Sequence, residues 1–152
     1  MTFLFDGEGP TRRALAAYPW HDHPLGSPDA WPDALKMALR LILSAPESMY
    51  LCWGPDRYFF HNDAYLPALG AERIDRAVGT RLHELWADVW EQVKPLVDKA
   101  MAGQASKFDD IPLQMAREGV EESTWWSFFY TPLFDAEGAI VLSSNCVRSK
   151  RS

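Results

Sequence analysis

The part of the sequence that says most about the fold is MYLCWGPDRYFFHNDAYLPALG, residues 49–70. Its two apolar runs, 49–53 and 57–61, are separated by a Gly-Pro-Asp turn, which is typical of two strands paired as a hairpin. The polar pair Asn62 and Asp63 then precedes a segment of one or two helical turns. The stretch therefore predicts a strand, a turn, a second strand and a short helix in succession.

The polar triplet within this stretch has two interpretations. As chemistry, His61 would be a base or a ligand oriented by Asp63. Neighbouring residues of a strand point to opposite faces, however, and Asn-Asp before a helix is a typical capping pattern. We therefore predict that Asn62 and Asp63 are structural caps, and that His61 is a strand-end residue whose orientation is open.

Beyond this stretch, helical patterns come first and strand patterns come last. Apolar residues recur at helical spacing over 31–45 and again over 83–103, where Pro95 either kinks the helix or begins a second one. Alternating spacing then predicts three strands, over 107–115, 123–134 and 139–147. Together with the hairpin, this order predicts an α+β fold in which an antiparallel sheet carries its helices on one face.

Large rings occupy both faces of the strand predicted over 123–134. Trp126 and Phe128 alternate onto one face, whereas Trp125 and Phe129 lie on the other. A strand with one face in solvent would carry polar residues on that face. We therefore expect both faces to be covered, one by the central helices and the other by the N-terminal helix or a partner chain.

The chain of 152 residues fits one domain with one core. Residues 1–30 are rich in Gly, Pro and Asp and contain one short helical pattern, TRRALAAY, so we assign them to an N-terminal cap segment. Residues 31–152 form a single domain in this interpretation. Its N-terminal helix over 31–45 precedes a core of about 48–147.

Charge and hydropathy exclude several classes of function. The net charge of −6 argues against nucleic acid and anionic lipid as partners. No apolar run approaches the roughly 20 residues of a membrane helix, and the first dozen residues lack the pattern of a signal peptide. We therefore expect a soluble, cytoplasmic protein in which Cys52 and Cys146 are reduced core residues.

The usual motifs of catalysis and metal binding are missing. The sequence has no glycine-rich phosphate loop and no nucleophile elbow. His21 and His23 would face the same way in an extended segment and could hold a metal, but no third ligand is evident nearby. His83 could be an axial ligand of a haem iron, or simply a polar residue in the first turn of a helix. We predict no catalytic residue and no metal site.

Large rings are frequent among the residues expected inside the domain: Trp53, Tyr65, Trp86, Trp90, Phe128 and Tyr130. A pocket lined by rings and a few polar groups suits a flat organic molecule. Alternatively, the rings pack against one another and leave no pocket. The sequence leaves both interpretations open.

Several motifs, taken in order, give the chain a resemblance to a known family. They are W-x-x-x-P-L-G-x-P-x-x-W-P-x-x-L at 20–35, WGP and NDAY within 53–65, Leu69-Gly70, ELWADVWEQVKPLVDKAMAG at 84–103, PLQMAREGVEES at 112–123 and FFYTPLFDAEG at 128–138. Over about 12–147, the chain resembles the PAS sensor domains at the N-terminus of many bacterial signalling histidine kinases. The resemblance implies a PAS fold, a five-stranded antiparallel sheet with helices on one face, here with an additional N-terminal helix.

The resemblance also implies a function. A PAS module senses a signal, dimerises and passes its state to an output domain, here in a two-component pathway. The expected partners are a small organic ligand, a second copy of the chain, and a histidine kinase or another signalling output protein. We expect the ligand to lie against Trp53, Tyr65, His83, Trp86, Phe128 and Tyr130, with Asn145 as a polar contact.

Two features differ from better-known PAS proteins. The sequence stops at Ser152 without a kinase domain, so we expect either a stand-alone sensor or an excised sensor domain. The light-sensing branch carries G-x-N-C-R-F-L-Q around its reactive cysteine, and neither Cys52 nor Cys146 lies in such a motif. His83 lies slightly ahead of the region that matches the histidine-bearing helix of the haem branch. Both signatures are absent, and the cofactor is unknown.

An enzyme is the alternative from a different class of function. A small α+β cone-type isomerase or hydratase would use His61 or His83 with Asp63. In that case a carboxylate and a histidine should point into the same cavity. If the Asp63 side chain instead accepts hydrogen bonds from backbone N–H groups of a helix, the enzyme interpretation fails.

Overall fold

The framework of the structure is an antiparallel sheet with the strand order β2-β1-β5-β4-β3. The computed structural model describes residues 4–104, 106–117, 120–133 and 139–147. The strands are β1 Met49–Trp53, β2 Tyr58–His61, β3 Ser106–Arg117, β4 Val120–Leu133 and β5 Ala139–Val147. The turn predicted at 135–138 lies outside the described residues.

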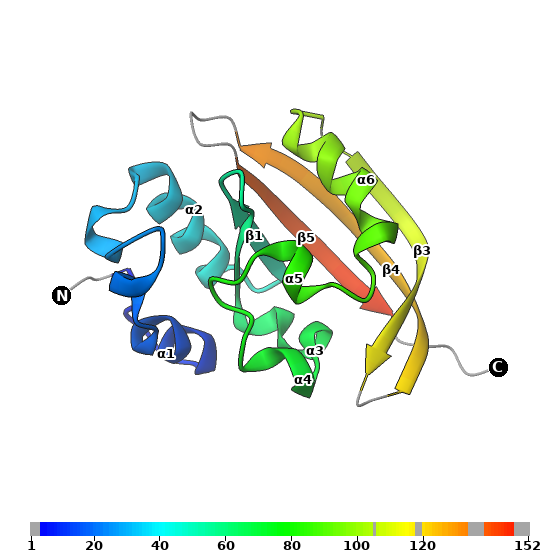
Figure 1. Ribbon diagram of the computed structural model, residues 1–152, viewed down its shortest axis with the longest axis horizontal. Helices are drawn as coiled ribbons and strands as arrows, with labels where there is room; N and C mark the ends of the chain where they lie inside the picture. Colours follow the sequence, from blue (N-terminus) through cyan, green and yellow to red (C-terminus); the bar gives the residue numbers. More distant parts are fainter. Residues whose placement is uncertain (1–3, 105, 118–119, 134–138, 148–152) are drawn as a thin grey trace.

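The helices lie before and between these strands. They are α1 Pro10–Ala17, α2 Asp33–Ser44, α3 Leu66–Leu69, α4 Ala71–Ile74, α5 Leu82–Leu85 and α6 Trp90–Met101, with 3-10 turns η1 Trp20–Asp22, η2 Pro28–Ala30 and η3 Asp63–Tyr65. Figure 1 shows α6 in front of the C-terminal strands, and α1 and α2 beside β1 at the other end of the sheet. None of the helices described is long and apolar enough to cross a membrane.

The hairpin predicted over 49–61 is confirmed, and its turn shows the local reason. Trp53 pairs with Tyr58 as the last pair before the turn. Gly54 has a φ of 79°, a left-handed conformation that glycine adopts without a steric penalty. The Arg57 N–H donates to the Gly54 carbonyl at 3.0 Å and closes the turn.

Alternation along β1 and β2 divides the buried side chains into two clusters. The core-face cluster lies under α3–α6 and includes Tyr50, Cys52, Phe59, Tyr65, Leu69, Leu82, Leu85, Trp86, Val89 and Val97. The cap-face cluster lies on the opposite face and includes Leu15, Trp20, Trp31, Leu35, Leu39, Ile42, Leu51, Trp53, Tyr58 and Phe60. Strands β1 and β2 are therefore buried on both faces, and the N-terminal cap segment with α2 covers the second face.

For β4, the expected coverage of both faces stays a prediction. Its ring-bearing side chains, those of Trp125, Trp126, Phe128 and Phe129, lie outside the described residues. What the structure does describe is the register, in which Phe128 pairs with Phe108 of β3 and with Ser144 of β5. The backbone of β4 is thus paired on both sides.

The helical region predicted over 83–103 is divided at a different place from the expected one. The break falls between α5 and α6, ahead of Trp90, and Pro95 lies inside α6 rather than at a helix start. Trp86 leaves helical geometry, with φ −109° and ψ 38°. The resulting turn allows both Trp86 and Val89 to enter the core-face cluster.

Candidate functional site

The core-face cluster brings together rings from the sheet, from η3 and from the turn after α5. The ring centroids of Tyr50 and Phe59 lie 4.8 Å apart, and Tyr65 meets Tyr50 edge-on at 5.3 Å. Trp86 is only 5% exposed and belongs to the same cluster. An aromatic layer between sheet and helices is the kind of surface on which flat organic molecules bind.

Arg73 of α4 is the buried charge beside this layer. Its guanidinium carbon lies 4.3 Å from the ring centroid of Trp86. Nη2 donates to the Asp88 carboxylate at 2.6 Å, and Nη1 donates to the Leu69 carbonyl at 3.2 Å. The third nitrogen, Nε, is buried and has no hydrogen-bond partner among the described residues. A buried N–H of this kind favours an acceptor at that position.

Sequence reasoning missed Arg73. The segment AERIDR contains both Arg73 and Arg76, and nothing local distinguishes them, although Arg73 is 3% exposed and Arg76 is exposed. The difference comes from Asp88, which lies 15 residues further along the chain. In the sequence, an arginine with an acidic residue 15 positions later is too common a pattern to predict a buried ion pair.

His61 faces the core-face cluster at the end of β2. It is 2% exposed, and its ring lies 5.7 Å from the ring of Phe59. Its Nδ1 lies 2.9 Å from the Asn62 carbonyl oxygen. Burial lowers the pKa of His61 below its ordinary value of 6.5, so the ring is neutral at neutral pH. The open question of its orientation is thereby answered: it points inward.

The prediction for Asn62 is wrong in its contacts. Asn62 occupies the N-cap position of η3, but its side chain makes no capping hydrogen bond there. Instead, Nδ2 donates to the carbonyls of Ile42 and Glu47 at 2.8 Å each, and Oδ1 accepts from the Met49 N–H at 3.2 Å. The side chain is 1% exposed and joins the end of α2 to the start of β1.

Asp63 is a cap, but of a different helix from the one predicted. Its Oδ1 accepts a hydrogen bond from the backbone N–H of Thr11, at 2.9 Å, in the first turn of α1. Gly9, the residue directly before α1, has a φ of 119°, and a Cβ at this position would collide with the Asp63 carboxylate. The carboxylate is therefore committed to a backbone N–H 52 residues earlier in the chain.

The structure brings some of the predicted ligand-site residues together and separates others. Tyr65 and Trp86 share the core-face cluster. Trp53 lies in the cap-face cluster, because it follows Cys52 on β1 and so points to the opposite face. His83 is exposed on α5, with its ring 5.9 Å from that of Trp90.

The remaining predicted site residues lie on β4 and β5. In the backbone register, Tyr130 pairs with Leu142, and Ser127 with Asn145. The side chains of Phe128, Tyr130 and Asn145 lie outside the described residues. Their part in a ligand site stays a prediction.

The histidine pair near the N-terminus does not converge. His21 is exposed, and its Nε2 lies 3.5 Å from the Asp22 carboxylate. His23 is buried; its Nε2 lies 2.8 Å from the Gly79 carbonyl oxygen, and its Nδ1 accepts from the Leu25 N–H at 3.0 Å. In the part of the chain that the structure describes, no three His, Cys, Asp or Glu side chains come together as metal ligands.

Cys52 is the cysteine whose surroundings the structure describes. It is fully buried on the core face, and burial raises the pKa of its thiol well above the ordinary range, outweighing the opposing charge of Arg57. The thiol is therefore protonated and unreactive at neutral pH. The side chain of Cys146 lies outside the described residues.

Comparison with known proteins identifies the family. A family model described as the PAS fold matches residues 46–147 of the chain. The chain belongs to the PAS family. The resemblance noted from the sequence motifs is therefore confirmed, and so is the α+β class of this PAS domain. No curated protein matches the chain.

Solved structures with the same fold include light-oxygen-voltage proteins. The chain is similar to the LOV protein of Rhodobacter sphaeroides, with 16% identity and a TM-score of 0.55 over 80% of this chain and 72% of that one. The RsLOV d2 variant gives 17% identity and a TM-score of 0.55, over 76% and 68%. The PAS domain of Bordetella pertussis BvgS gives 17% identity and a TM-score of 0.49, over 79% and 89%. At these identities the likeness concerns the fold alone.

The geometry does not favour the enzyme alternative. Asp63 would have to orient a histidine, but its carboxylate accepts from the Thr11 N–H at 2.9 Å. His61 is buried and close to its neighbour's carbonyl, whereas His83 is exposed on a separate helix. No histidine and carboxylate among these three residues share a cavity that the structure describes.

Proposed function

We propose that this PAS domain is a sensory module of signal transduction that binds a small organic ligand on its core face. The observation that carries the proposal is the buried Arg73 Nε, which has no partner among the described residues and lies beside the Trp86 ring. An aromatic layer with a buried donor beside it suits a flat molecule that carries an acceptor, such as a carboxylate or a carbonyl.

The proposed ligand wall consists of Tyr65, Trp86 and Arg73 on the helical side. Phe128, Tyr130 and Asn145 would complete it from β4 and β5. Trp53 is left out, because it lies in the cap-face cluster. His83 is exposed and would lie at the outer edge of the site at most.

The output is proposed from the family. A ligand that binds one state of the domain more tightly than another shifts the equilibrium between them by that difference in affinity. We propose that the shift is passed to a histidine kinase or another output protein of a two-component pathway, and that the domain itself is not an enzyme. The assignment of Asp63 to a helix cap supports this last point.

We also propose that the domain acts as a homodimer. On α2, Met37 and Leu41 are 70% and 62% exposed and lie one helical turn apart. Two adjacent large apolar side chains on the outer face of a helix favour burial against a second surface. A second copy of the chain would present the same pair in a symmetric contact.

A ligand screen tests the sensory proposal. Purified protein is examined by absorption spectroscopy and by thermal unfolding against a panel of small carboxylates, ketones and aromatic metabolites. We expect a rise in melting temperature with flat, acceptor-bearing compounds, because ligands that bind only the folded state stabilise it. A colourless protein that shows no shift with any compound would contradict the proposal and leave dimerisation as the function.

A further inference from the structure

Arg73 of α4 distributes its hydrogen bonds so that one buried donor remains. Nη2 donates to the Asp88 carboxylate at 2.6 Å, and Nη1 donates to the Leu69 carbonyl at 3.2 Å. Nε is buried and has no hydrogen-bond partner among the described residues. On the core face, Nε is therefore the atom of Arg73 that a ligand would contact.

The bond from Arg73 to Asp88 disfavours a carboxylate as the group at Nε. A carboxylate binds a guanidinium most strongly through two parallel hydrogen bonds, which need two neighbouring donors. The donor beside the N–H of Nε is Nη2, which already donates to Asp88. A ligand carboxylate would share Nη2 with Asp88, and the two negative charges would repel each other strongly where water is largely excluded.

Burial adds a second reason against an anion. Arg73 is 3% exposed and is the one buried arginine or lysine among the described residues. Its positive charge is compensated by Asp88, whose side chain is 24% exposed. An ionised group that leaves water needs a counter-charge of its own, whereas a carbonyl needs only a hydrogen-bond donor. The donor is present at Nε, but the charge of Arg73 is already paired.

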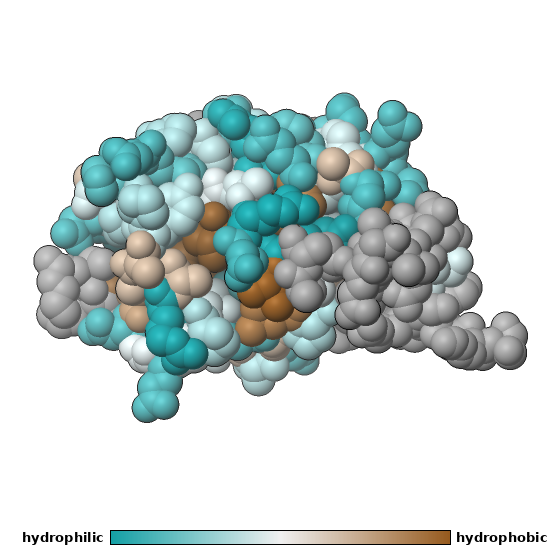
Figure 2. Space-filling view, turned by 60° about the horizontal axis from the view of Figure 1, so that its bottom comes forward, coloured by the Kyte–Doolittle hydropathy of each residue, from teal (hydrophilic) through white to brown (hydrophobic). Residues whose placement is uncertain are grey.

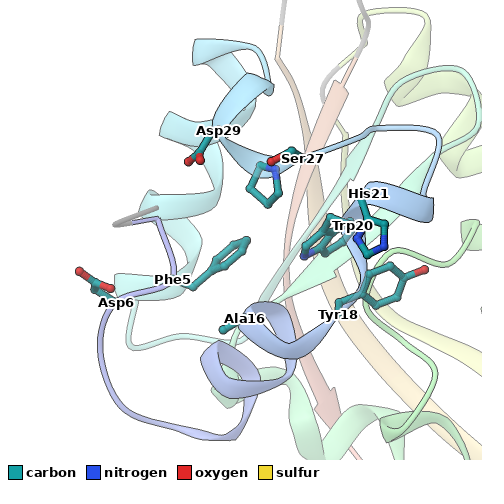
Figure 3. A pocket seen from close by; sticks show the side chains of 9 residues that line it. Phe5, Asp6, Ala16, Tyr18, Trp20, His21, Ser27 and Asp29 are labelled. Atoms are coloured by element: carbon teal, nitrogen blue, oxygen red, sulfur yellow. The ribbon is translucent and has the colours of Figure 1, made fainter. Parts of the chain in front are cut away.

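The hollow in the N-terminal cap segment offers no comparable donor. Its volume is about 460 Å³, and Figure 3 shows the rings of Phe5 and Trp20 on opposite sides of it. These residues are 7% and 4% exposed, so a ligand would cover little of either ring. None of the buried, unpartnered polar atoms of the described residues lines the hollow. The hollow therefore serves as a control for the position of binding.

Given the core-face site of the proposed function, on which this step rests, we infer that its ligand is a flat, uncharged molecule with one neutral acceptor. An amide carbonyl, a ketone or a ring nitrogen accepts the hydrogen bond from Nε of Arg73. The ring of the ligand lies in the aromatic layer that includes Trp86. Asp88 excludes carboxylic acids of the same shape, because they are ionised at neutral pH.

The test compares amides with acids that carry the same ring. The probes are benzamide and benzoate, 2-naphthamide and 2-naphthoate, and indole-3-carboxamide and indole-3-carboxylate. Dissociation constants are measured at neutral pH by isothermal titration calorimetry on the full chain. Asp88→Asn removes the negative charge but keeps an acceptor for Nη2. Asp98→Asn is the matched control, because Asp98 pairs with Arg57 at 3.0 Å, and Ala16→Phe fills the hollow of the cap segment.

In the natural chain we expect at least one amide to bind, and its acid to bind at least about tenfold more weakly, as for a like charge at close range. Asp88→Asn should strengthen binding of the acid by about tenfold and change that of the amide by less than about threefold. Asp98→Asn and Ala16→Phe should leave the ratio and the amide affinity unchanged. The ratio in the natural chain tests the preference by itself, even where a variant does not fold.

An acid that binds as tightly as its amide would overturn this inference and leave the sensory proposal standing. Equal effects of Asp88→Asn and Asp98→Asn would overturn the role of Asp88, and loss of binding in Ala16→Phe would overturn the position of the site. If no amide binds although the wider ligand screen yields a compound, this inference alone fails. If neither experiment yields a ligand, the proposed function fails with it.

Discussion

Asn62 shows how one side chain can hold two elements in register. Its amide donates to the Ile42 carbonyl near the end of α2 and to the Glu47 carbonyl after it, and accepts from the N–H of Met49, the first residue of β1. Asn62 is 1% exposed, so its own amide would lack partners if these contacts were lost. An unsatisfied buried polar group costs more than an ordinary hydrogen bond contributes.

We therefore expect Asn62→Asp to destabilise the fold strongly. A carboxylate cannot donate to the carbonyls of Ile42 and Glu47, and it places a negative charge against them. The expected loss is about 2–4 kcal/mol in the free energy of unfolding, measured by urea denaturation. Gln104→Glu is the control, because it makes the same change from amide to acid at an exposed position. Equal stability of the two variants would refute this role for Asn62.

His61 should make the stability of the domain depend on pH. Its folded pKa lies below the unfolded value of 6.5, because burial disfavours the charged ring. As pH falls below 6.5, the unfolded chain takes up a proton that the folded chain does not, so the free energy of unfolding decreases. Above that pH the contribution is fully present.

The measurement is the free energy of unfolding at several pH values between about 5 and 8, for the natural chain and for His61→Gln. We expect the difference between the two proteins to grow as pH rises through this window and to level off above it. A difference that does not vary with pH would show that His61 titrates alike in both states.

At the scale of elements, α1 depends on a residue far from it in sequence. Asp63, which follows β2, accepts the Thr11 N–H and so caps α1 while fixing it to the domain. Asp63→Ala should cost about 1 kcal/mol of stability. Hydrogen exchange should become faster in α1 but not in β1. Asp75→Ala, an exposed acid at the end of α4, is the control, and equal exchange in α1 for both variants would contradict the assignment.

The secondary-structure elements show which parts of the fold could be predicted from the sequence and which could not. Local patterns were enough for the hairpin over 49–61, for the helix over 31–45 and for an N-terminal helix, because these follow from side-chain spacing and turn residues. Asn62 and Asp63 were recognised as structural, but their partners were not, because Ile42 and Thr11 are distant in the chain. The division of the region over 83–103 also depended on tertiary packing, since Trp86 leaves the helix to enter the core.

The candidate site divides in the same way. Tyr65 and Trp86 could be predicted as inward rings from their elements alone. Trp53 could not be assigned to a face, because strand alternation says that Cys52 and Trp53 differ but not which of them meets the helices. Arg73 needed Asp88 and the Trp86 ring beside it, and this pairing is visible only in the folded chain.

At the scale of the whole molecule, the face drawn in Figure 2 is mostly hydrophilic where its residues are coloured. Figure 2 shows one face on which hydrophobic residues gather only in small areas near the middle of the view. The most exposed large apolar side chains among the described residues are Met37, Leu41 and Ile74. Met37 and Leu41 are neighbours on α2, whereas Ile74 lies on α4. Leu41 and Ile74 are therefore matched positions at which a substitution can test dimerisation.

We expect Leu41→Glu to weaken the homodimer, because it puts a charge into the proposed contact between two copies. The dissociation constant should rise at least about tenfold, measured by sedimentation equilibrium. Ile74→Glu, which changes an exposed apolar residue outside that contact, should leave the constant unchanged. A protein that is monomeric at all concentrations, or equal effects of both substitutions, would exclude this dimer.

The central claim is that the core face binds a small molecule through its aromatic layer and Arg73. Native mass spectrometry of the full chain, with and without a stabilising compound from the screen, tests it most directly. Arg73→Met is compared with Arg57→Met, because Arg57 also pairs with an aspartate, at 3.0 Å, and also has a buried Nε without a partner among the described residues. Arg57 differs in lying 5.6 Å from the Trp90 ring instead of beside Trp86, and in being more exposed, at 22% against 3%. We predict one added ligand mass per chain in the natural protein and in Arg57→Met, and its loss in Arg73→Met. Bare chains in all three proteins, or a ligand retained equally by Arg73→Met, would contradict the account.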